Sequence, residues 1–560
     1  MLSGAQIHRR FEGGVSWTLG TLVIVLAVMA PLLSLAVYGL QGSFEHWRHL
    51  FESVIPNAAI NTLILLAGVG VLVTCLGTGA AWLVSAYEFP TRSWLNWALL
   101  LPLAVPTYII AFAYLDLWHP IGPIQTVLRD LLGYTSPRDL RLPDVRSITG
   151  AIFLLGFVLY PYVYLSTRFM FITQAAGMIE AARILGETPY RVVTRVALPL
   201  ARPAIAVGVS LALLETLNDI GASEFLGVQT MTVAIYTTWV TRSDLAGAAQ
   251  IALSMLLIVV FLIQIERRAR QRQRYSTVQR MRPMQLMVLK GWHKWVAVTL
   301  GWIPVVIGFI APASYLAVQV YHRLDVSGSI SSQLTSAAIN TLTVSAVATV
   351  LTIGLGLVVG WSARRIRDSS QKLSLAQWLA KIASLGYAVP GTVLAIGLLA
   401  PLLLIDSLFE WVSSLFGVQI TQLFVMGSMA GLLIAYSIRF LAIAVGSIEA
   451  GLSRIPPSIE QASRLLGHTP SQTLKTIHLP LLRPALASAA LLIFVDTMKE
   501  LPATLLLRPL NFDTLATWLY AEASRGTYEE GAVAALLIVL VGLIPVILLA
   551  RTQSRPLFSS

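Results

Sequence analysis

A polar stretch that occurs twice between long apolar runs constrains this chain more than any other feature of its sequence. Residues 180–186 read Glu-Ala-Ala-Arg-Ile-Leu-Gly and precede Leu198-Pro199, and residues 461–467 read Gln-Ala-Ser-Arg-Leu-Leu-Gly and precede Leu479-Pro480. In both copies the glycine and the proline are thirteen positions apart. Such a recurrence indicates one structural unit that is used twice.

The composition is that of a membrane protein. The 560 residues are 56% hydrophobic and 12% charged, whereas soluble domains have about 25% charged residues. A helix needs about 20 apolar residues to cross a bilayer. We therefore expect an all-α, polytopic protein with about twelve transmembrane helices, six in each half. The predicted spans are 17–40, 58–84, 96–117, 148–171, 202–226, 246–264, 295–319, 337–361, 382–406, 422–446, 483–507 and 530–550.

Basic residues predict the orientation of the spans. The net charge is +12, and a dense basic run occupies 266–274 between the two halves. Such runs stay in the cytoplasm, and with six spans on each side both termini are predicted to be cytoplasmic. Because the cations lie in loops, with no soluble domain to present them, we do not expect nucleic-acid binding. The predicted division is a first unit (1–265), a basic cytoplasmic linker (266–294) and a second unit (295–560).

The duplication extends through both halves. Ala-Ala-Ile-Asn-Thr-Leu stands at both 58–63 and 337–342, and Ala-Val-Pro stands at both 104–106 and 388–390. Since each half has an even number of spans, the two six-helix units are expected to share one orientation, related by an axis along the membrane normal.

The repeated polar stretch predicts a helix, a glycine turn and a second short helix. Gly186 can end the first helix in a left-handed conformation, and Thr188-Pro189 is typical of a helix start. The arginines of the stretch keep it out of the bilayer. On the predicted topology both copies project into the cytoplasm, where their small alanines allow another protein to approach closely.

With these motifs the chain resembles the permease subunits of binding-protein-dependent ABC importers, whose cytoplasmic loop carries an E-A-A, then G, then I-x-L-P pattern. The resemblance covers essentially the whole chain as two fused permease units. It departs from the family pattern at Val196, where isoleucine is usual, and at Gln461, which takes the glutamate position next to Glu460. The residues that the resemblance assigns to coupling with an ATPase are Glu180, Ala181, Ala182, Gly186, Leu198, Pro199, Glu460, Gln461, Ala462, Gly467, Leu479 and Pro480.

The resemblance implies a multi-pass subunit of a bacterial inner (plasma) membrane, with two copies of a cytoplasmic ATPase and an extracytoplasmic substrate-binding protein as partners. The chain has no G-x-x-x-x-G-K-[ST] motif, so ATP and Mg are expected on the partner ATPase, and we expect no enzyme activity and no cofactor here. Segments 221–229 and 499–514 look most like those of ferric iron permeases. Fused thiamine or phosphonate permeases are the alternatives.

Four acidic residues of the fifth spans are candidates for the transport pathway. Glu215 and Asp219 lie four positions apart, hence on one helix face, and Asp496 and Glu500 repeat that spacing. Ionisable residues inside spans are costly and suggest function. A ring of carboxylates would suit a ferric ion in passage, without a stably bound metal. The alternative is that these acids pair with Lys499 or cap broken helices.

Two other classes of protein share parts of this pattern. An ion-driven secondary transporter also has twelve spans in parallel repeats, but it needs no matching cytoplasmic loops. A membrane-anchored scaffold needs no polar groups inside its spans. The external segment 118–147 is expected to form either a short amphipathic helix at 124–132 or a loop-like spacer, and its counterpart in the second half is expected at 406–421.

Overall fold

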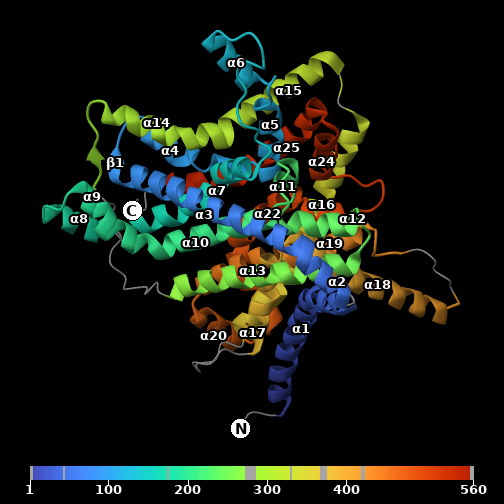
Figure 1. Ribbon diagram of the computed structural model, residues 1–560. Coiled ribbons are helices and arrows are strands. Elements are labelled where there is room, and N and C mark those ends of the chain that lie inside the picture. The colour runs from blue at the N-terminus through green and yellow to red at the C-terminus, as the bar shows by residue number, and fades with distance from the viewer. Residues whose placement is uncertain are drawn as a thin grey trace. The chain divides into compact units, whose positions relative to one another are not determined.

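The computed structural model of this chain describes residues 4–41, 44–172, 176–271, 285–327, 329, 331–365, 375–417 and 423–554. Within these residues, eleven helices are long and apolar enough to cross a membrane, or twelve if one bent pair counts as a single span. The prediction of an all-α, polytopic membrane protein is confirmed (Figure 1). Of the predicted linker, residues 272–284 lie outside the described part.

The chain forms two compact units that do not follow its sequence order. Unit 1 comprises residues 1–47, 235–253 and 332–517. Unit 2 comprises residues 48–234, 254–331 and 518–560. Each compact unit takes helices from both halves of the chain. The predicted units 1–265 and 295–560 describe the repeat in the sequence, and they stay a prediction.

The helices of unit 1 come mainly from the second half of the chain. They are α1 (Gly4–Gln41), α16 (Ser332–Arg365), α17 (Leu375–Ala383), the 3-10 helix η6 (Ser384–Ala388), α18 (Gly391–Leu415), α19 (Met429–Ser453), α20 (Pro457–Leu465), α21 (Pro470–Thr473), the π-helix η7 (Leu474–His478), α22 (Leu479–Met498) and α23 (Pro502–Leu507).

The elements of unit 2 come mainly from the first half. They are η1 (Leu50–Val54), α3 (Ile55–Ala86), β1 (Tyr87–Glu88), α4 (Arg92–Ala98), η2 (Leu101–Ala104), α5 (Thr107–Leu117), α6 (Pro123–Leu132), α7 (Ile148–Met170), α8 (Ala176–Ile184), α9 (Pro189–Arg191), η4 (Val192–Ala197), α10 (Leu198–Asn218), α11 (Gly221–Phe225), β2 (Met287–Val288), α14 (His293–Val305), η5 (Val306–Ile310), α15 (Ala311–Ser327) and α25 (Tyr528–Ser554). Four helices contribute to both units: α2 (Phe44–His49), α12 (Met231–Val240), α13 (Leu245–Gln271) and α24 (Leu515–Arg525).

The first span of each half belongs to the compact unit that is formed mainly by the other half. In unit 1, α1 packs on α16, α17 and α18. A Cβ added to Gly397 would collide with the carbonyl of Pro31, so only glycine permits this approach of α18 to α1. In unit 2, α15 packs on α5 and α25, and Tyr315 donates a hydrogen bond of 2.6 Å to Asp116.

Proline sets the form of both third spans. Helices 92–104 and 107–117 meet at Pro106 with a bend of 93°, since proline has no N–H to continue a helix. Pro390 separates η6 from α18 in the same way. The predicted span 382–406 is therefore wrong in its limits. The helix that crosses runs over Gly391–Leu415, so it also takes up most of the segment that was predicted to be external at 406–421.

Both fifth spans are interrupted near their ends. Helix α10 stops at Asn218 and the short helix α11 follows, and α22 stops at Met498 before α23. The predicted spans 202–226 and 483–507 are thus each a helix, a break and a short helix, as in the alternative that their acids cap broken helices. Proline or glycine near the break, at Gly221 and Pro502, fits this change of direction.

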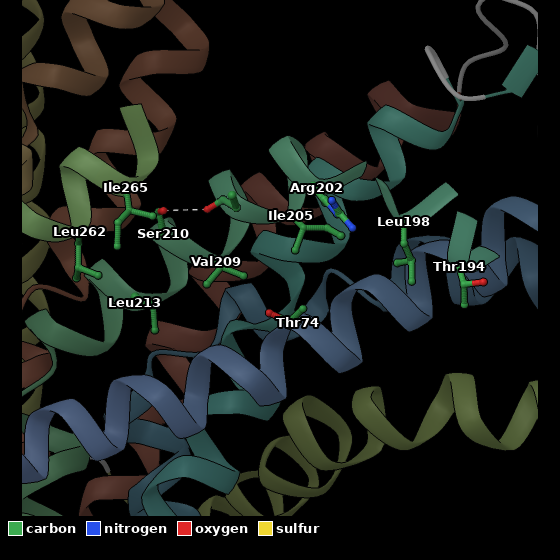
Figure 2. Close-up of a pocket in the computed structure, with 11 residues that line it drawn as sticks. Thr74, Thr194, Leu198, Arg202, Ile205, Val209, Ser210, Leu213, Leu262 and Ile265 are labelled. Carbon is green, nitrogen blue, oxygen red and sulfur yellow. Dashed lines mark hydrogen bonds between the residues drawn. The ribbon is translucent and has the colours of Figure 1, made fainter. Parts of the chain in front are cut away.

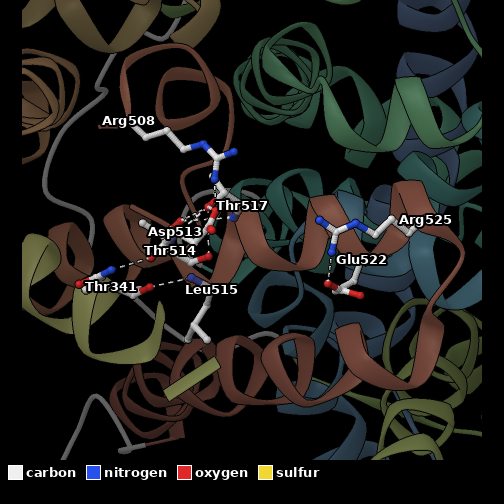
Figure 3. A network of polar contacts seen from close by, with 9 residues as sticks. Thr341, Arg508, Asp513, Thr514, Leu515, Thr517, Glu522 and Arg525 are labelled. Carbon is white, nitrogen blue, oxygen red and sulfur yellow. Dashed lines mark hydrogen bonds and ion pairs between the residues drawn. The ribbon is translucent and has the colours of Figure 1, made fainter. Parts of the chain in front are cut away.

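The repeated Asn-Thr pair of the second spans holds the chain that follows each break. The side-chain amide of Asn340 donates to the carbonyl of Asp513 at 3.1 Å, and Thr341 accepts from the N–H of Leu515 at 2.7 Å (Figure 3). In unit 2, Asn61 and Thr62 make the equivalent bonds with Gln229 and Met231. We call this pair of hydrogen bonds the clamp. Because the same Asn and Thr side chains bond backbone groups in both units, the clamp explains why the two hexapeptides are identical.

Replacement of Thr341 by valine tests the clamp. Thr341 is 2% exposed, so valine keeps the shape but leaves the N–H of Leu515 without its acceptor. We expect a loss of about 1–3 kcal/mol of stability, seen as a lower unfolding temperature in detergent. The exposed Thr343→Val is the matched control. Equal unfolding temperatures for both variants would contradict the clamp.

Candidate functional site

The two polar repeats form loops of the same geometry. We name residues 176–199 the first docking loop and residues 457–480 the second, after the contact with another protein that the sequence predicts for them. Gly186 has φ +83° and Gly467 has φ +82°, in the left-handed region where glycine is favoured. Each glycine ends a helix and precedes Thr-Pro. The predicted order of helix, glycine turn and second helix is confirmed in both copies.

Hydrogen bonds explain the turn. The N–H of Glu187 donates to the carbonyl of Ala182, and the N–H of His468 donates to that of Ser463, which closes the end of α8 and of α20. Threonine then caps the next helix. Thr469 accepts from the N–H of Gln472, whose side chain accepts from the N–H of Thr469 at 2.8 Å, so the second docking loop contains a capping box.

Each loop exposes an apolar pair at its turn. Ile184 and Leu185 are 85% and 84% exposed, and Leu465 and Leu466 are 89% and 79% exposed. In Figure 1, α8 and α9 lie beyond one end of α10. Burial of such a pair against another protein is favourable because it removes apolar area from water. The repeat therefore places the same apolar contact surface at the turn of each loop.

A π-helical turn within each loop leads into the fifth span. Elements η4 and η7 end directly before Leu198-Pro199 and Leu479-Pro480, and neither proline has an N–H to donate into the preceding turn. Widened turns of this kind are frequent at functional sites. In unit 2, Leu198 and Arg202 line one end of a largely apolar hollow of about 510 Å³ along α10 (Figure 2).

The structure separates the predicted coupling residues by exposure. Those on the surface are Ala181, Gly186, Gln461, Ala462, Gly467 and Pro480. Those that are partly covered are Glu180, Ala182, Leu198, Pro199, Glu460 and Leu479. Their role in coupling stays a prediction. Gln461 stands on the surface where the motif has glutamate, whereas Glu460 turns inward.

Glu460 belongs to a charged group that attaches the second docking loop to the spans. Nε of Arg364 lies 2.8 Å from Oε1 of Glu460, and Nε2 of His478 lies 3.2 Å from the same oxygen. Arg364 also donates to the carbonyls of Leu452 and Ile455. Arg364, at the end of α16, thus binds α19 and α20, and Glu460 extends the group to His478 of η7.

These contacts keep Glu460 ionised. Burial alone would raise the pKa of this carboxyl, but hydrogen bonds from His478 and Arg364 outweigh burial and lower the pKa from its ordinary 4.5 to about 2. Because the pKa is lower in the folded protein, the stabilisation is complete above pH 4.5 and is lost as the pH falls through about 2. Glu460 therefore does not change its charge between pH 5 and 8.

Replacement of Glu460 by glutamine tests this attachment. It leaves the largely covered guanidinium of Arg364 without its counter-charge, so we expect a loss of about 3 kcal/mol of stability at pH 7. The exposed neighbour gives the matched control, since Gln461→Ala should change stability by less than about 0.5 kcal/mol. Unfolding temperatures in detergent measure both. An equal effect at the two positions would contradict the assignment.

In the fifth span of unit 2, Asp219 caps the short helix after the break. Its carboxylate accepts from the hydroxyl of Thr107 at 2.6 Å, from the N–H of Ser223 at 2.9 Å and from the N–H of Ala222 at 3.4 Å. Asp219 is 7% exposed. Its hydrogen bonds fit the alternative that these acids cap broken helices.

Glu500 has the same position in unit 1 but a different partner. It accepts from the N–H groups of Ala503 and Thr504 at 3.0 and 3.1 Å, and Nη1 of Arg439 lies 3.5 Å from its Oε1. Thr107 of unit 2 is replaced by Gly391, where a Cβ would collide with Nη1 of Arg439. The absence of a side chain at Gly391 therefore makes room for the guanidinium of Arg439. As a result, Asp219 has a hydroxyl partner and Glu500 has a cationic partner.

Of the remaining two acids, Asp496 forms an ion pair of 2.8 Å with Lys499. Glu215 lies on α10 and is partly covered. Among the described residues, neither unit by itself gathers three His, Cys, Asp or Glu side chains in a group able to hold a metal ion. A four-carboxylate pathway stays a prediction.

Three important residues were not predicted from the sequence: Arg364, Arg439 and His478. Arg439 is an ionisable residue within an apolar run, which is in itself a signal for function. Neither Arg364 nor His478 carries such a signal. Their contacts depend on helices far apart in sequence, so no local pattern identifies them.

A sequence model of a protein family matches the chain twice. Its description is "Binding-protein-dependent transport system inner membrane component", and the matches cover residues 73–275 and 353–557. Each match contains one docking loop and one interrupted fifth span. The two matches together cover more than half of the chain.

Individual relatives cover the chain to different extents. The Fe(3+)-transport system permease protein FbpB 2 of Haemophilus influenzae is 26% identical over 95% of this chain and 96% of its own length. The probable ABC transporter permease protein y4fN of Sinorhizobium fredii is 23% identical over 94% of this chain and 92% of its own. The putative 2-aminoethylphosphonate transport system permease protein PhnU of Salmonella choleraesuis is 28% identical over 46% of this chain and 92% of its own.

Proposed function

The chain belongs to the family of binding-protein-dependent transport system inner membrane components, and we propose that the cargo of this member is ferric iron. The chain is a fused, two-unit permease of an ABC importer and a multi-pass inner membrane protein. Permease subunits of this family are not themselves enzymes. What the proposal adds is the cargo, the number of ATPase subunits and the role of the docking loops.

The match to a ferric iron permease along nearly the whole length of both chains is the observation that carries the cargo. That relative has the same fused form, because the match includes both repeats. Acidic residues in both interrupted fifth spans agree with a hard cation, which prefers carboxylate oxygen. Since related folds transport different cargoes, the cargo needs a direct test.

We propose that the two docking loops bind two copies of the ATPase subunit. Two loops with matching glycine turns and matching exposed apolar pairs support a pair of equal partners. ATP and Mg then belong to the partners. In this proposal both loops and both termini lie in the cytoplasm; the basic run at 266–274 supports this orientation.

A phosphonate is the second candidate cargo. PhnU and PhnV, both putative 2-aminoethylphosphonate permeases, are 28% and 27% identical to parts of this chain. These matches cover 46% and 35% of the chain. These partial matches support a shared permease fold, and an experiment has to identify the cargo.

Uptake by cells discriminates between the cargoes. Cells that lack this chain and cells that express it from a plasmid are supplied with radiolabelled ferric citrate or radiolabelled 2-aminoethylphosphonate. We expect the plasmid to restore uptake of iron and to leave phosphonate uptake unchanged. Restored uptake of phosphonate alone would overturn the iron proposal while leaving the importer assignment intact.

A further inference from the structure

We propose that residues 285–289, which follow the basic run between the halves, act as a brace that positions the first docking loop for coupling. The proposal rests on the docking role given to the loops above and does not depend on the cargo. It assigns a function to a part of the linker that the sequence shows only as a connection.

The brace contacts the docking loop through the backbone of one residue. The N–H of Gln285 donates to Oε1 of Glu180 at 2.9 Å, and Nη1 of Arg183 donates to the carbonyl of Gln285 at 3.0 Å. Hydrogen bonds with a charged partner are the stronger ones. Two charged side chains of α8 thus bind both polar groups of one residue, so the contact depends on the backbone of Gln285.

The other end of the brace is attached to the second span. Met287 and Val288 of β2 pair in parallel with Tyr87 and Glu88 of β1, and the N–H of Leu289 donates to the carbonyl of Glu88 at 3.0 Å. Strand β1 directly follows α3. Five residues of the linker therefore connect the docking helix α8 to the end of a transmembrane helix.

The second docking loop is also attached to the second span of its half, but by direct contacts and not through a linker. Arg364, at the end of the second span α16, binds Glu460 and the carbonyls beside it. The equivalent positions of the first half hold Ser85, Ile179 and Ala197, all buried. These residues form no charged group, and the brace supplies the missing attachment between second span and loop.

Replacement of Gln285 by proline tests the brace. Proline removes the N–H that binds Glu180, whereas Gln285→Ala keeps every backbone group. We measure cargo transported per ATP hydrolysed in proteoliposomes with the ATPase and a loaded binding protein. Loss of one charge-assisted hydrogen bond corresponds to about a tenfold change in a local equilibrium. We expect Gln285→Pro to lower the transport ratio several-fold and Gln285→Ala to match the unaltered protein.

Further variants separate the brace from general damage. Arg183→Met removes the other hydrogen bond and should lower the ratio in the same direction at an unchanged unfolding temperature. A protease site placed at 272–284 and cut after assembly should leave the ratio unchanged, because the brace is held by non-covalent contacts. Equal ratios for Gln285→Pro and Gln285→Ala, or a loss caused by the cut alone, would overturn the brace. If Gly186→Val also leaves the ratio unchanged, the docking role itself fails.

Discussion

Arg439→Met should lower the stability of this protein by about 3–5 kcal/mol, the usual cost of leaving one partner of a buried ion pair without its counter-charge. Arg439 is 9% exposed and the side chain of Glu500 is 1% exposed. Methionine fills a similar volume but has no charge. The carboxylate of Glu500 would then be buried at the break between α22 and α23 without a counter-charge.

Two companion variants show whether the ion pair is the cause. The double variant Arg439→Met, Glu500→Gln removes both charges and should recover part of the lost stability. Arg439→Met combined with Gly391→Thr recreates the hydroxyl that Asp219 has in unit 2, and it should also recover part of the loss. The exposed Arg454→Met, at the residue directly after the same helix, is the control. Unfolding temperatures in detergent that are equal for Arg439→Met and Arg454→Met would contradict this account.

Gly186→Val and Gly467→Val should each uncouple ATP hydrolysis from transport without unfolding the spans. A β-branched residue in the left-handed region costs roughly 1–2 kcal/mol, enough to shift a local equilibrium about tenfold. No atom lies within 4 Å of a Cβ added at either glycine. The expected effect is therefore one of backbone conformation at the turn, which moves the exposed apolar pair.

A graded series tests this cause. Asparagine tolerates the left-handed region, so Gly186→Asn should keep most of the coupling, Gly186→Ala less and Gly186→Val least. Gly177→Ala, on α8 and also in open space, is the control. The measurement is stimulation of the ATPase by the loaded binding protein together with cargo uptake. Normal stimulation and uptake in Gly186→Val would rule out the turn as a coupling element.

Local patterns predicted the docking loops well. Glycine, Thr-Pro and the alternation of apolar and polar runs act over a few residues, so the glycine turns and most spans followed from them. The third span of the second half was misplaced, because the apolar run that contains it also includes Pro390 and part of the helix before Pro390. The breaks of the fifth spans, at Asp219 and Glu500, were predicted only as an alternative, because apolar residues lie on both sides of each break.

Contacts between distant segments were not predictable. The exchange of first spans between the halves depends on packing such as that of Gly397 against Pro31. The pairing of Arg439 with Glu500 depends on the absence of a side chain at Gly391, and no hydropathy pattern reveals this dependence. The ion pair of Glu460 with Arg364 joins residues 96 positions apart.

ATP-dependent uptake in proteoliposomes tests the central claim most directly. The vesicles contain this chain with its ATPase, and receive binding protein loaded with ferric iron, thiamine or 2-aminoethylphosphonate. The account predicts that ferric iron alone both stimulates ATP hydrolysis and accumulates inside, and that uptake stops without ATP. Iron uptake driven by an ion gradient in the absence of ATP, or stimulation by an organic cargo alone, would contradict it.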